Sequence, residues 1–512
     1  DKFYYITTPI YYPSAKPHMG HAYSSIIADF FARFKKIDGF KVHFLTGTDE
    51  HGLKIQRAAE KKGIDTLDFC NEISQTFRNL SKTLNLTNTD FIRTTEDRHK
   101  KTVQHLWTEL VNNGDIYLSK YSGWYSVSDE AFYNDDEIEE HDGKKIAISS
   151  KSIVEWMDEE SYFFKLSKWE KPLLDFYKNN PDFISPESRK NEVISFVKNG
   201  LKDLSVSRKS FSWGIKVPED NNHVIYVWLD ALTNYISALN YPDKKEKLFK
   251  QFWPASLHLI GKDILRFHAI YWPAFLLAAK IELPKKVYGH GWILSDDEKM
   301  SKSKGNILDP LEIIDQYGLD PLRYYLIKEV SFGNDGNISQ DRLEDCINSD
   351  LANNFGNLCQ RVTAFTIKNC DSKIPTEIEF SKDDLNILDK YKNNIDEIRN
   401  KIDKQDLNYY IEYIVNSLFE ANKYFNDQEP WKKKDDKKRL NTIVFTSLEI
   451  VRKISFMLYP IIPESSLKAL AIFDIKEDQI KFSSIADNNF LKKGNSINSI
   501  GLLFKKIEKK ND

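Results

Sequence analysis

The sequence predicts an α/β protein in which one parallel β-sheet is split by an inserted module and followed by an all-α helical bundle. A short apolar strand, a helical pattern and a second strand open the chain, and this signature returns after about residue 221. Beyond about residue 330 strands become scarce and long amphipathic patterns dominate. We therefore expect sheet-domain halves at 1–115 and 221–330, an inserted module at 116–220 and a bundle at 331–512.

The first half of the sheet domain begins with an apolar strand pattern at residues 3–7. Three prolines between residues 9 and 17 then break the chain into a loop. Apolar residues at three-to-four spacing predict a helix over 18–36, and residues 42–46 predict a second strand ended by Gly47. A strand, a helix and a strand in this order form the right-handed unit of a parallel sheet.

The rest of the chain divides by pattern. Residues 116–220 alternate short aromatic runs with turns, which predicts a module that is mostly β or mixed. Strand patterns resume at 224–228, 257–260 and 287–291, and helical patterns follow at 385–425 and 439–458. Six lysines between residues 492 and 510 make the end locally basic, either as a solvated tail or as one that contacts phosphates.

Composition excludes several classes of protein. The 512 residues carry 73 Lys plus Arg against 76 Asp plus Glu, a net charge of −3, which excludes a globally basic binder but not a local basic track. A hydrophobic content of 41% excludes a mostly disordered chain, and no apolar run is long enough for a membrane span. Four cysteines without a C-x-x-C pair favour a reducing compartment over a disulfide scaffold.

The first candidate functional motif is His18-Met19-Gly20-His21, which follows the first strand and opens the first helix. The N–H groups at a helix start attract phosphate. His18 and His21 share one helix face and can donate hydrogen bonds to phosphate oxygens, while Gly20 leaves room for a flat base. Taken alone, these residues also fit two surface histidines. Neither common glycine-rich phosphate motif is present.

The second candidate motif is Lys299-Met300-Ser301-Lys302-Ser303, which lies behind a polar turn after the last strand pattern. Lys299 and Lys302 can close over a polyphosphate as flexible point charges, and the two serines can add hydrogen bonds. A solvated basic loop is the alternative interpretation of this segment.

Together the two motifs, in this order and followed by a helical domain, resemble the signatures of class I aminoacyl-tRNA synthetases. Four further blocks resemble the methionyl-tRNA synthetases in particular, namely TTPIYY at 7–12, GTDEHG at 47–52, VWLDA at 227–231 and GKDILRFH at 261–268. The resemblance runs from Phe3 to about Trp431. It implies a Rossmann-like catalytic domain, an inserted connective module and an anticodon-binding bundle.

The resemblance also implies an activity and its residues. A member of this family activates L-methionine with ATP and Mg²⁺ and transfers it to initiator and elongator tRNA(Met). The catalytic residues would be His18, His21, Lys299 and Lys302, and ATP would also contact Gly20, Gly289, His290, Gly291, Met300, Ser301 and Ser303. The methionine pocket would comprise Ile10, Tyr12, Asp49, Trp228, Ala231, Leu232, Tyr235, Ile264 and His268. The CAU anticodon would be read by Asn357, Arg361 and Trp431.

The chemistry of these residue types agrees with the implied substrate. A thioether suits a pocket with aromatic walls, and Asp49 matches the carboxylate that holds the α-amino group. Without the family, Trp228 and Tyr235 would read as ordinary core residues. Because methionine differs from homocysteine by one methyl group, worth only ~1–3 kcal/mol, we expect the synthetic site to cyclise homocysteine, as in relatives.

Two departures from the family pattern matter. Many relatives bind zinc through cysteine knuckles in the insertion, whereas residues 116–220 contain no cysteine and one histidine, His141. A structural zinc needs four N or S ligands, so we expect none. The chain also lacks the appended domain that dimerises some relatives, which favours a monomer, and we expect a cytoplasmic protein. A synthetase for another apolar amino acid and an inactive tRNA-binding relative remain the alternatives.

Overall fold

The computed structural model describes residues 1–13, 16–295, 298–300 and 308–509. The chain divides into two compact units. The sheet unit comprises Phe3–Ala28 and Val42–His290, and the helical unit comprises Asp1–Lys2, Asp29–Lys41 and Gly291–Asp512. Residues 291–330, which the sequence pattern groups with the sheet domain, therefore cluster with the helical part of the chain.

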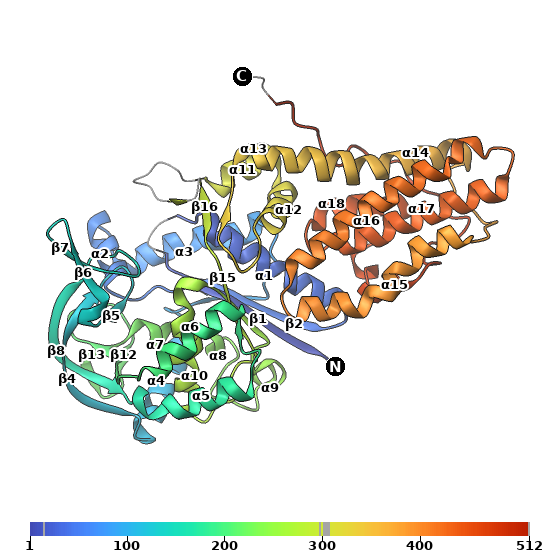
Figure 1. The fold of residues 1–512 in the computed structure, drawn as a ribbon. Coiled ribbons are helices and arrows are strands. Elements are labelled where there is room, and N and C mark those ends of the chain that lie inside the picture. Colours follow the sequence, from blue (N-terminus) through green and yellow to red (C-terminus); the bar gives the residue numbers. More distant parts are fainter. Residues whose placement is uncertain (14–15, 296–297, 301–307, 510–512) are drawn as a thin grey trace. The chain divides into compact units, whose positions relative to one another are not determined.

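The sheet unit is built on a six-stranded sheet with the order β3-β2-β1-β14-β15-β9 (Figure 1). The strands are β1 (Phe3–Tyr11), β2 (Lys41–Thr48), β3 (Asp90–Arg93), β9 (Ile184–Ser185), β14 (Leu257–Gly261) and β15 (Val287–His290). β1 pairs parallel with β14, and β15 pairs parallel with both β14 and β9. The short edge strand β9 comes from the stretch expected as the insertion, so that stretch contributes to the parallel sheet itself.

The helix expected at 18–36 is observed close to its expected position. The first helix, α1, runs over Met19–Ile37 and follows β1 after the proline-containing loop. The others are α2 (Leu53–Lys62), α3 (Thr66–Thr83), α4 (Asp97–Asn112), α7 (Val227–Leu232), α8 (Asn234–Ser237), α9 (Lys247–Phe252) and α10 (Trp272–Ala278). A buried apolar core of large aromatic and aliphatic side chains joins α4, α7, α8 and α10 to the sheet.

The inserted stretch is mixed β and α, as predicted. The long strands β4 (Ile116–Ser126) and β8 (Glu155–Phe164) pair antiparallel, flanked by β5 (Ala131–Tyr133) and β10 (Leu204–Ser205). A hairpin of β6 (Ile138–His141) and β7 (Lys144–Ala147) and two helices, α5 (Glu170–Asn179) and α6 (Glu187–Lys198), complete it.

The prediction that residues 224–228 form a strand of the parallel sheet is wrong. Its observed counterpart, β13 (Asp220–Ile225), pairs antiparallel with β11 (Ser207–Arg208) and β12 (Lys216–Val217). The chain then turns directly into α7, which buries four apolar side chains. A short apolar run fits a buried helix as well as a strand, so periodicity did not separate the two.

The helical unit is a bundle, as predicted. Its main helices are α11 (Pro310–Tyr317), α12 (Leu319–Glu329), α13 (Gln340–Cys346), a π-helical turn (Ile347–Gly356), α14 (Asn357–Asn369), α15 (Lys382–Asp403), α16 (Leu407–Gln428), α17 (Lys437–Leu458) and α18 (Pro463–Leu470). The small sheet β17-β16-β18 comprises Glu298–Lys299, Ile293–Ser295 and Gly336–Asn337. The pattern over 385–425 belongs to two helices, because the chain turns after Asp403 and Asp406 caps α16 through the Tyr409 N–H.

A buried ion-pair cluster explains why Asp29–Lys41 groups with the bundle. Asp29 on α1 accepts from Arg33 Nε at 2.7 Å and pairs with Arg323 on α12 at 2.7 Å, and all three side chains are almost fully buried. Phe30 meets Tyr410 of α16 edge to face at 5.2 Å. The second half of α1 is thus held to the bundle by paired charge and aromatic packing. No helix in the described residues is long and apolar enough to cross a membrane.

Candidate active site

The two histidines of the first motif form the start of α1. The N–H of Gly20 donates to Nδ1 of His18 at 3.1 Å, and the N–H of His18 donates to Nδ1 of His21 at 3.0 Å. The two rings stack with centroids 3.8 Å apart. Because each Nδ1 accepts a hydrogen bond, each neutral imidazole carries its proton on Nε2. The helix start therefore combines backbone N–H groups with two imidazole donors, an arrangement that suits phosphate oxygens.

The surroundings of His21 keep its ring neutral. The ring packs against Tyr11 at 4.8 Å and Phe77 at 5.0 Å. Burial, with a smaller contribution from the neighbouring His18, lowers the pKa of His21 well below its usual 6.5. At neutral pH the ring can donate a hydrogen bond from Nε2 without carrying charge, and an anion bound beside it would favour its protonated form.

The boundary between the two units falls at the end of β15, between His290 and Gly291. In the sheet unit, a Cβ at Gly289 would lie 3.6 Å from the Cα of Lys262, and His290 Nε2 lies 2.6 Å from Ser24 Oγ of α1. In the helical unit, a Cβ at Gly291 would lie only 2.3 Å from the carbonyl of Asn334, so this position requires glycine for backbone packing. Contacts of Gly289, His290 and Gly291 with ATP stay predictions.

The second motif is placed only in part. Lys299 is exposed in β17, and its Nζ lies 4.7 Å from the ring centre of Trp292. Met300 is the last residue of that described stretch. Ser301, Lys302 and Ser303 lie outside the described residues. Their roles at the ATP phosphates, and the joint action of Lys299 and Lys302, therefore stay predictions.

A small pocket in the sheet unit collects most of the residues predicted to bind methionine. It is lined by Pro9, Ile10, Asp49, Trp228, Ala231, Leu232, Asn234, Tyr235, Ile264 and His268. Eight of the nine predicted residues are among them, while Pro9 and Asn234 were not predicted. The cavity measures about 20 Å³. A cavity of this size has room for about one water molecule, so the pocket is narrow as it stands.

The apolar walls of this pocket contain one polar pair that is satisfied internally. His268 Nδ1 donates to the carbonyl of Ile264 at 3.0 Å, and Tyr235 donates from its hydroxyl to His268 Nε2 at 2.6 Å. Trp228 stacks on Phe267 with ring centres 3.8 Å apart. Burial lowers the pKa of His268 to about 4, so the pair carries no charge at neutral pH. An uncharged, polarizable side chain such as a thioether fits these walls.

The neutral His268 predicts an acid dependence of stability. The folded state keeps His268 unprotonated down to about pH 4, whereas the unfolded chain binds the proton near 6.5. The stabilisation is therefore complete above 6.5 and is lost as the pH falls towards 4, by about 3 kcal/mol from this residue. Denaturant unfolding of wild type and His268→Gln at pH 7 and 4 measures the difference, and parallel losses in both proteins would contradict it.

Three buried polar atoms of the pocket residues have no hydrogen-bond partner among the described residues. They are Asp49 Oδ1, Trp228 Nε1 and Asn234 Oδ1. Burial, followed by repulsion from Asp230, raises the pKa of Asp49 well above its usual value. A buried carboxylate oxygen without a donor is costly, and a bound cation would remove that cost. The site thus joins an apolar pocket to a buried carboxyl that forms no ion pair with the described residues.

The neighbouring carboxylates, by contrast, are well satisfied. Arg93 pairs with Glu50 through two bonds of 2.7 Å. Asp230 lies between His51 Nδ1 at 2.6 Å and His99 Nε2 at 2.7 Å. Burial would raise the pKa of Asp230, but the two histidines outweigh it and hold the pKa below its usual value. Asp49 is therefore the acidic group of this cluster left with an unpartnered oxygen.

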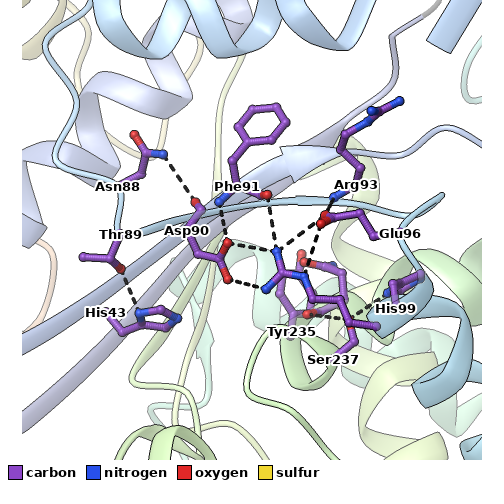
Figure 2. Close-up of polar contacts among 12 residues, drawn as sticks. His43, Asn88, Thr89, Asp90, Phe91, Arg93, Glu96, His99, Tyr235 and Ser237 are labelled. Atoms are coloured by element: carbon purple, nitrogen blue, oxygen red, sulfur yellow. Dashed lines mark hydrogen bonds and ion pairs between the residues drawn. The ribbon is translucent and has the colours of Figure 1, made fainter. Parts of the chain in front are cut away.

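The His51–Asp230–His99 chain continues to Ser237, whose Oγ lies 2.7 Å from His99 Nδ1. Figure 2 shows this last pair, His99 and Ser237. Ser237 lies two residues after the pocket residue Tyr235, and His51 lies two residues after Asp49. The chain of hydrogen bonds thus joins the two segments that carry the polar groups of the pocket. His51 and Asp230 stand inside blocks that carried the family resemblance, but spacing alone did not indicate that they meet.

Tyr12 is the predicted methionine residue that does not line the pocket. Its hydroxyl lies 2.6 Å from Glu130 Oε1 and 3.0 Å from the carbonyl oxygen of His51. Glu130 belongs to the inserted stretch and was not predicted. Tyr12 therefore connects the segment after β1 with the GTDEHG block and the insertion.

The residues predicted to read the anticodon lie in the helical unit. Asn357 and Arg361 are one turn apart on α14, with Asn357 exposed. Arg361 hydrogen-bonds Asn426 and lies 5.1 Å from the ring centre of Phe425. Trp431 is 41% exposed and meets Phe425 edge to face at 6.0 Å. Arg361 and Trp431 thus meet on the Phe425 ring, while Asn357 lies one helical turn before Arg361. A guanidinium, an indole and an amide are the kinds of group that read unpaired bases.

Within the part of the chain that the structure describes, no group of three or more His, Cys, Asp or Glu side chains is placed to hold a metal ion.

Comparisons with known proteins agree with this arrangement. A family model described as "tRNA synthetases class I (M)" matches residues 4–363, and one described as "Anticodon binding domain of methionyl tRNA ligase" matches residues 374–512. The chain is 49% identical to the methionine–tRNA ligase of Rickettsia felis over 99% of this chain and 98% of the relative. It is 46% identical to that of Mycobacterium leprae over 94% and 91%, respectively. A solved structure of Mycobacterium tuberculosis methionyl-tRNA synthetase in complex with methionyl-adenylate matches with a TM-score of 0.96 at 44% identity, over 98% of this chain and all of that one.

Proposed function

The chain belongs to the methionyl-tRNA synthetase family of class I aminoacyl-tRNA synthetases, and on that premise we propose how its residues do the chemistry. The protein is a methionine–tRNA ligase that activates methionine with ATP and charges tRNA. The observation that carries the residue assignment is the unpartnered, buried Asp49 Oδ1 at an uncharged apolar pocket. One end of that site suits an ammonium group, and the other suits a thioether.

In the first step the methionine carboxylate attacks the α-phosphorus of ATP in line. The P–O bond to the leaving group breaks, giving methionyl-adenylate and pyrophosphate. Asp49 holds the α-ammonium group, and the His268–Tyr235 pair faces the thioether. His18 and His21 donate hydrogen bonds to phosphate oxygens as charge builds on them, and Lys299 and Lys302 hold the leaving pyrophosphate.

In the second step a ribose hydroxyl of the tRNA 3′-terminal adenosine attacks the carbonyl carbon of the adenylate. The ester to AMP breaks and the methionyl group moves to the tRNA. Neither step forms a covalent bond to the protein, so catalysis consists of positioning and electrostatic stabilisation. The same pocket would admit homocysteine, whose own thiol can attack the activated carbonyl and form a thiolactone.

Mg²⁺ would enter with ATP. Magnesium in nucleotide sites is bound mainly by phosphate oxygens and water, so a dedicated cluster of protein ligands is not required. When bound, it would neutralise phosphate charge during the attack. We further propose that the protein works as a cytoplasmic monomer with initiator and elongator tRNA(Met), in keeping with its place in translation.

Amino-acid-dependent ATP–pyrophosphate exchange tests the activation step. The panel is methionine, leucine, isoleucine, valine and cysteine. Exchange with methionine alone is expected, because the uncharged aromatic and aliphatic walls of the pocket suit an unbranched thioether. Exchange with a different amino acid would keep the class and overturn the pocket assignment. Folded protein that exchanges with none of them would favour an inactive tRNA-binding relative.

The anticodon residues give a separate prediction. Trp431→Ala and Arg361→Ala are each expected to lower kcat/KM for tRNA charging about 10- to 100-fold, because a stacked or hydrogen-bonded base is worth about 1–3 kcal/mol. Methionine-dependent exchange should stay within about twofold of wild type, since that step needs no tRNA. Phe419→Ala removes another exposed aromatic ring of the helical unit and is the matched control. Equal losses in the control and in Trp431→Ala would contradict the assignment.

A further inference from the structure

A tight turn of the inserted stretch presents one buried carboxylate, that of Glu130. The preceding residue, Asp129, shapes the turn: its backbone N–H donates to Ser126 Oγ at 3.0 Å, and its carboxylate accepts from the Tyr133 hydroxyl at 2.6 Å. Glu130 itself is 1% exposed and has a φ of +52°. A buried acid and a left-handed backbone are both unfavourable for glutamate, and such positions are often functional.

Both carboxylate oxygens of Glu130 are used. Tyr12 donates to Oε1 at 2.6 Å, and Tyr125 donates to Oε2. The backbone N–H of Lys54 also donates to Oε1, at 3.4 Å. Lys54 lies in the first turn of α2, whose N-cap residue, Gly52, has no side chain to cap it. Glu130 therefore supplies, from a distant part of the chain, an acceptor and a negative charge at this helix start.

The backbone of Glu130 makes a further connection. Its carbonyl oxygen accepts from the Tyr226 hydroxyl at 2.6 Å. The contact with Gly52 is equally close, since a Cβ there would lie 2.6 Å from Glu130 Oε1 and 2.8 Å from the Tyr12 hydroxyl oxygen. Gly52 also has a φ of +111°, so both the backbone and the space require glycine.

These contacts reach three of the four segments that build the proposed methionine pocket, all but the one that carries Ile264 and His268. Tyr12 follows Ile10, Gly52 follows Asp49, and Tyr226 precedes Trp228, each by two or three residues. The three segments are far apart in the sequence and meet at one residue of the insertion. Loss of the Glu130 side chain would thus free the segments of Tyr12 and Lys54 from a shared anchor, whereas Tyr226 is held by the Glu130 backbone carbonyl.

Charge adds a second effect. The groups that hydrogen-bond the Glu130 carboxylate are two phenols and one backbone N–H, which are uncharged, while the cations Arg208 and Lys54 act on it without a direct side-chain bond. Glu130 also lies close enough to Asp49 to raise the pKa of that carboxyl, after burial and Asp230. An ionised Glu130 would therefore contribute negative potential where the α-ammonium group of the substrate binds.

From this convergence we infer that Glu130 is a positioning residue for methionine: it sets the Asp49 and Trp228 segments and adds negative potential for the α-ammonium group. The inference rests on the proposed function. It assigns the inserted stretch a role in amino-acid binding, apart from any contact that this stretch makes with tRNA.

The test is methionine-dependent ATP–pyrophosphate exchange by full-length wild type, Glu130→Gln and Glu130→Ala. Glutamine keeps the shape and one acceptor oxygen but removes the charge, and alanine removes all side-chain contacts. We expect KM for methionine to rise about tenfold in Glu130→Gln and further in Glu130→Ala, since hydrogen bonds to charged groups are worth about 1.5–3 kcal/mol. KM for ATP should stay within about twofold.

Two further measurements separate positioning from a merely structural role. Tyr12→Phe combined with Glu130→Gln should raise KM by less than the product of the single effects, because the two residues share one hydrogen bond. The matched control is Glu139→Gln, an exposed glutamate of the same insertion that pairs with Lys151 at 2.8 Å. It should behave as wild type in KM and in thermal unfolding.

The possible outcomes are distinct. If both Glu130 variants keep the wild-type KM for methionine and only unfold at a lower temperature, Glu130 is structural and the inference is wrong. Equal increases of KM for methionine and for ATP would also overturn it. If wild type itself shows no exchange with methionine, the proposed function fails first and the inference fails with it.

Discussion

Asp49→Asn is expected to weaken methionine binding by about 100- to 1000-fold, because it leaves the substrate ammonium group buried without a counter-charge, at a cost of about 3–5 kcal/mol. Asparagine has nearly the same shape as aspartate, so the pocket itself is retained. Methionine binding by titration calorimetry and KM in the exchange reaction measure the loss. KM for ATP should change little, because Asp49 lines the amino-acid pocket.

The same substitution should make the free protein more stable. Burial raises the pKa of Asp49, so its ionisation opposes folding at neutral pH, and this opposition shrinks as the pH falls from the raised pKa towards the usual value of 3.8. Asparagine removes the cost, which predicts a higher unfolding temperature at pH 7 and a smaller gain at low pH. Asp142→Asn, at an exposed turn of the insertion, is the control. A free Asp49→Asn protein less stable than wild type at pH 7 would argue that Asp49 is paired in solution.

His21→Ala is expected to lower the rate of adenylate formation by about 100- to 1000-fold, the usual effect of removing one donor to developing charge. Methionine binding should stay within about twofold, because His21 is not among the residues that line the amino-acid pocket. Single-turnover formation of methionyl-adenylate gives the first quantity and equilibrium binding gives the second.

The control for His21→Ala is His141→Ala, an exposed histidine of the insertion whose side chain is 70% accessible. It should leave both quantities unchanged. Equal losses of methionine binding and of adenylate formation in His21→Ala would show that His21 supports the pocket rather than the reaction. Such an effect would pass through the Tyr11 ring, which His21 contacts and which lies at the end of β1 next to Ile10.

Much of the architecture follows from the sequence. The strand at the N-terminus, α1 after the proline-containing loop, β2, β14, β15 and the helical bundle all stand where apolar periodicity predicts them. These elements are long or strongly patterned, and the spacing of apolar residues within each one determines which face is buried. The family resemblance similarly predicted eight of the ten pocket residues, because their blocks keep the local spacing that the family shares.

Other features could not be predicted from local pattern. The apolar run at 224–228 has no periodicity that separates a strand from a helix. The secondary structure that it adopts depends on antiparallel partners more than five residues away. β9 is only two residues long and exists because β15 offers it a parallel edge. The grouping of residues 29–41 with the bundle follows from a charge cluster with Arg323, almost 300 residues later.

By itself, then, the sequence determined the class of fold and the start of α1 with its two histidines, and the family resemblance named most residues that line the proposed methionine pocket. Only the tertiary structure decided that Asp49 keeps an unpartnered oxygen, that Asp230 lies between His51 and His99, and that Glu130 anchors Tyr12. The physical reason is the range of the interactions. Periodicity and capping act within one or two helical turns, whereas the cost of burying a charge depends on which distant groups the fold brings within hydrogen-bond distance.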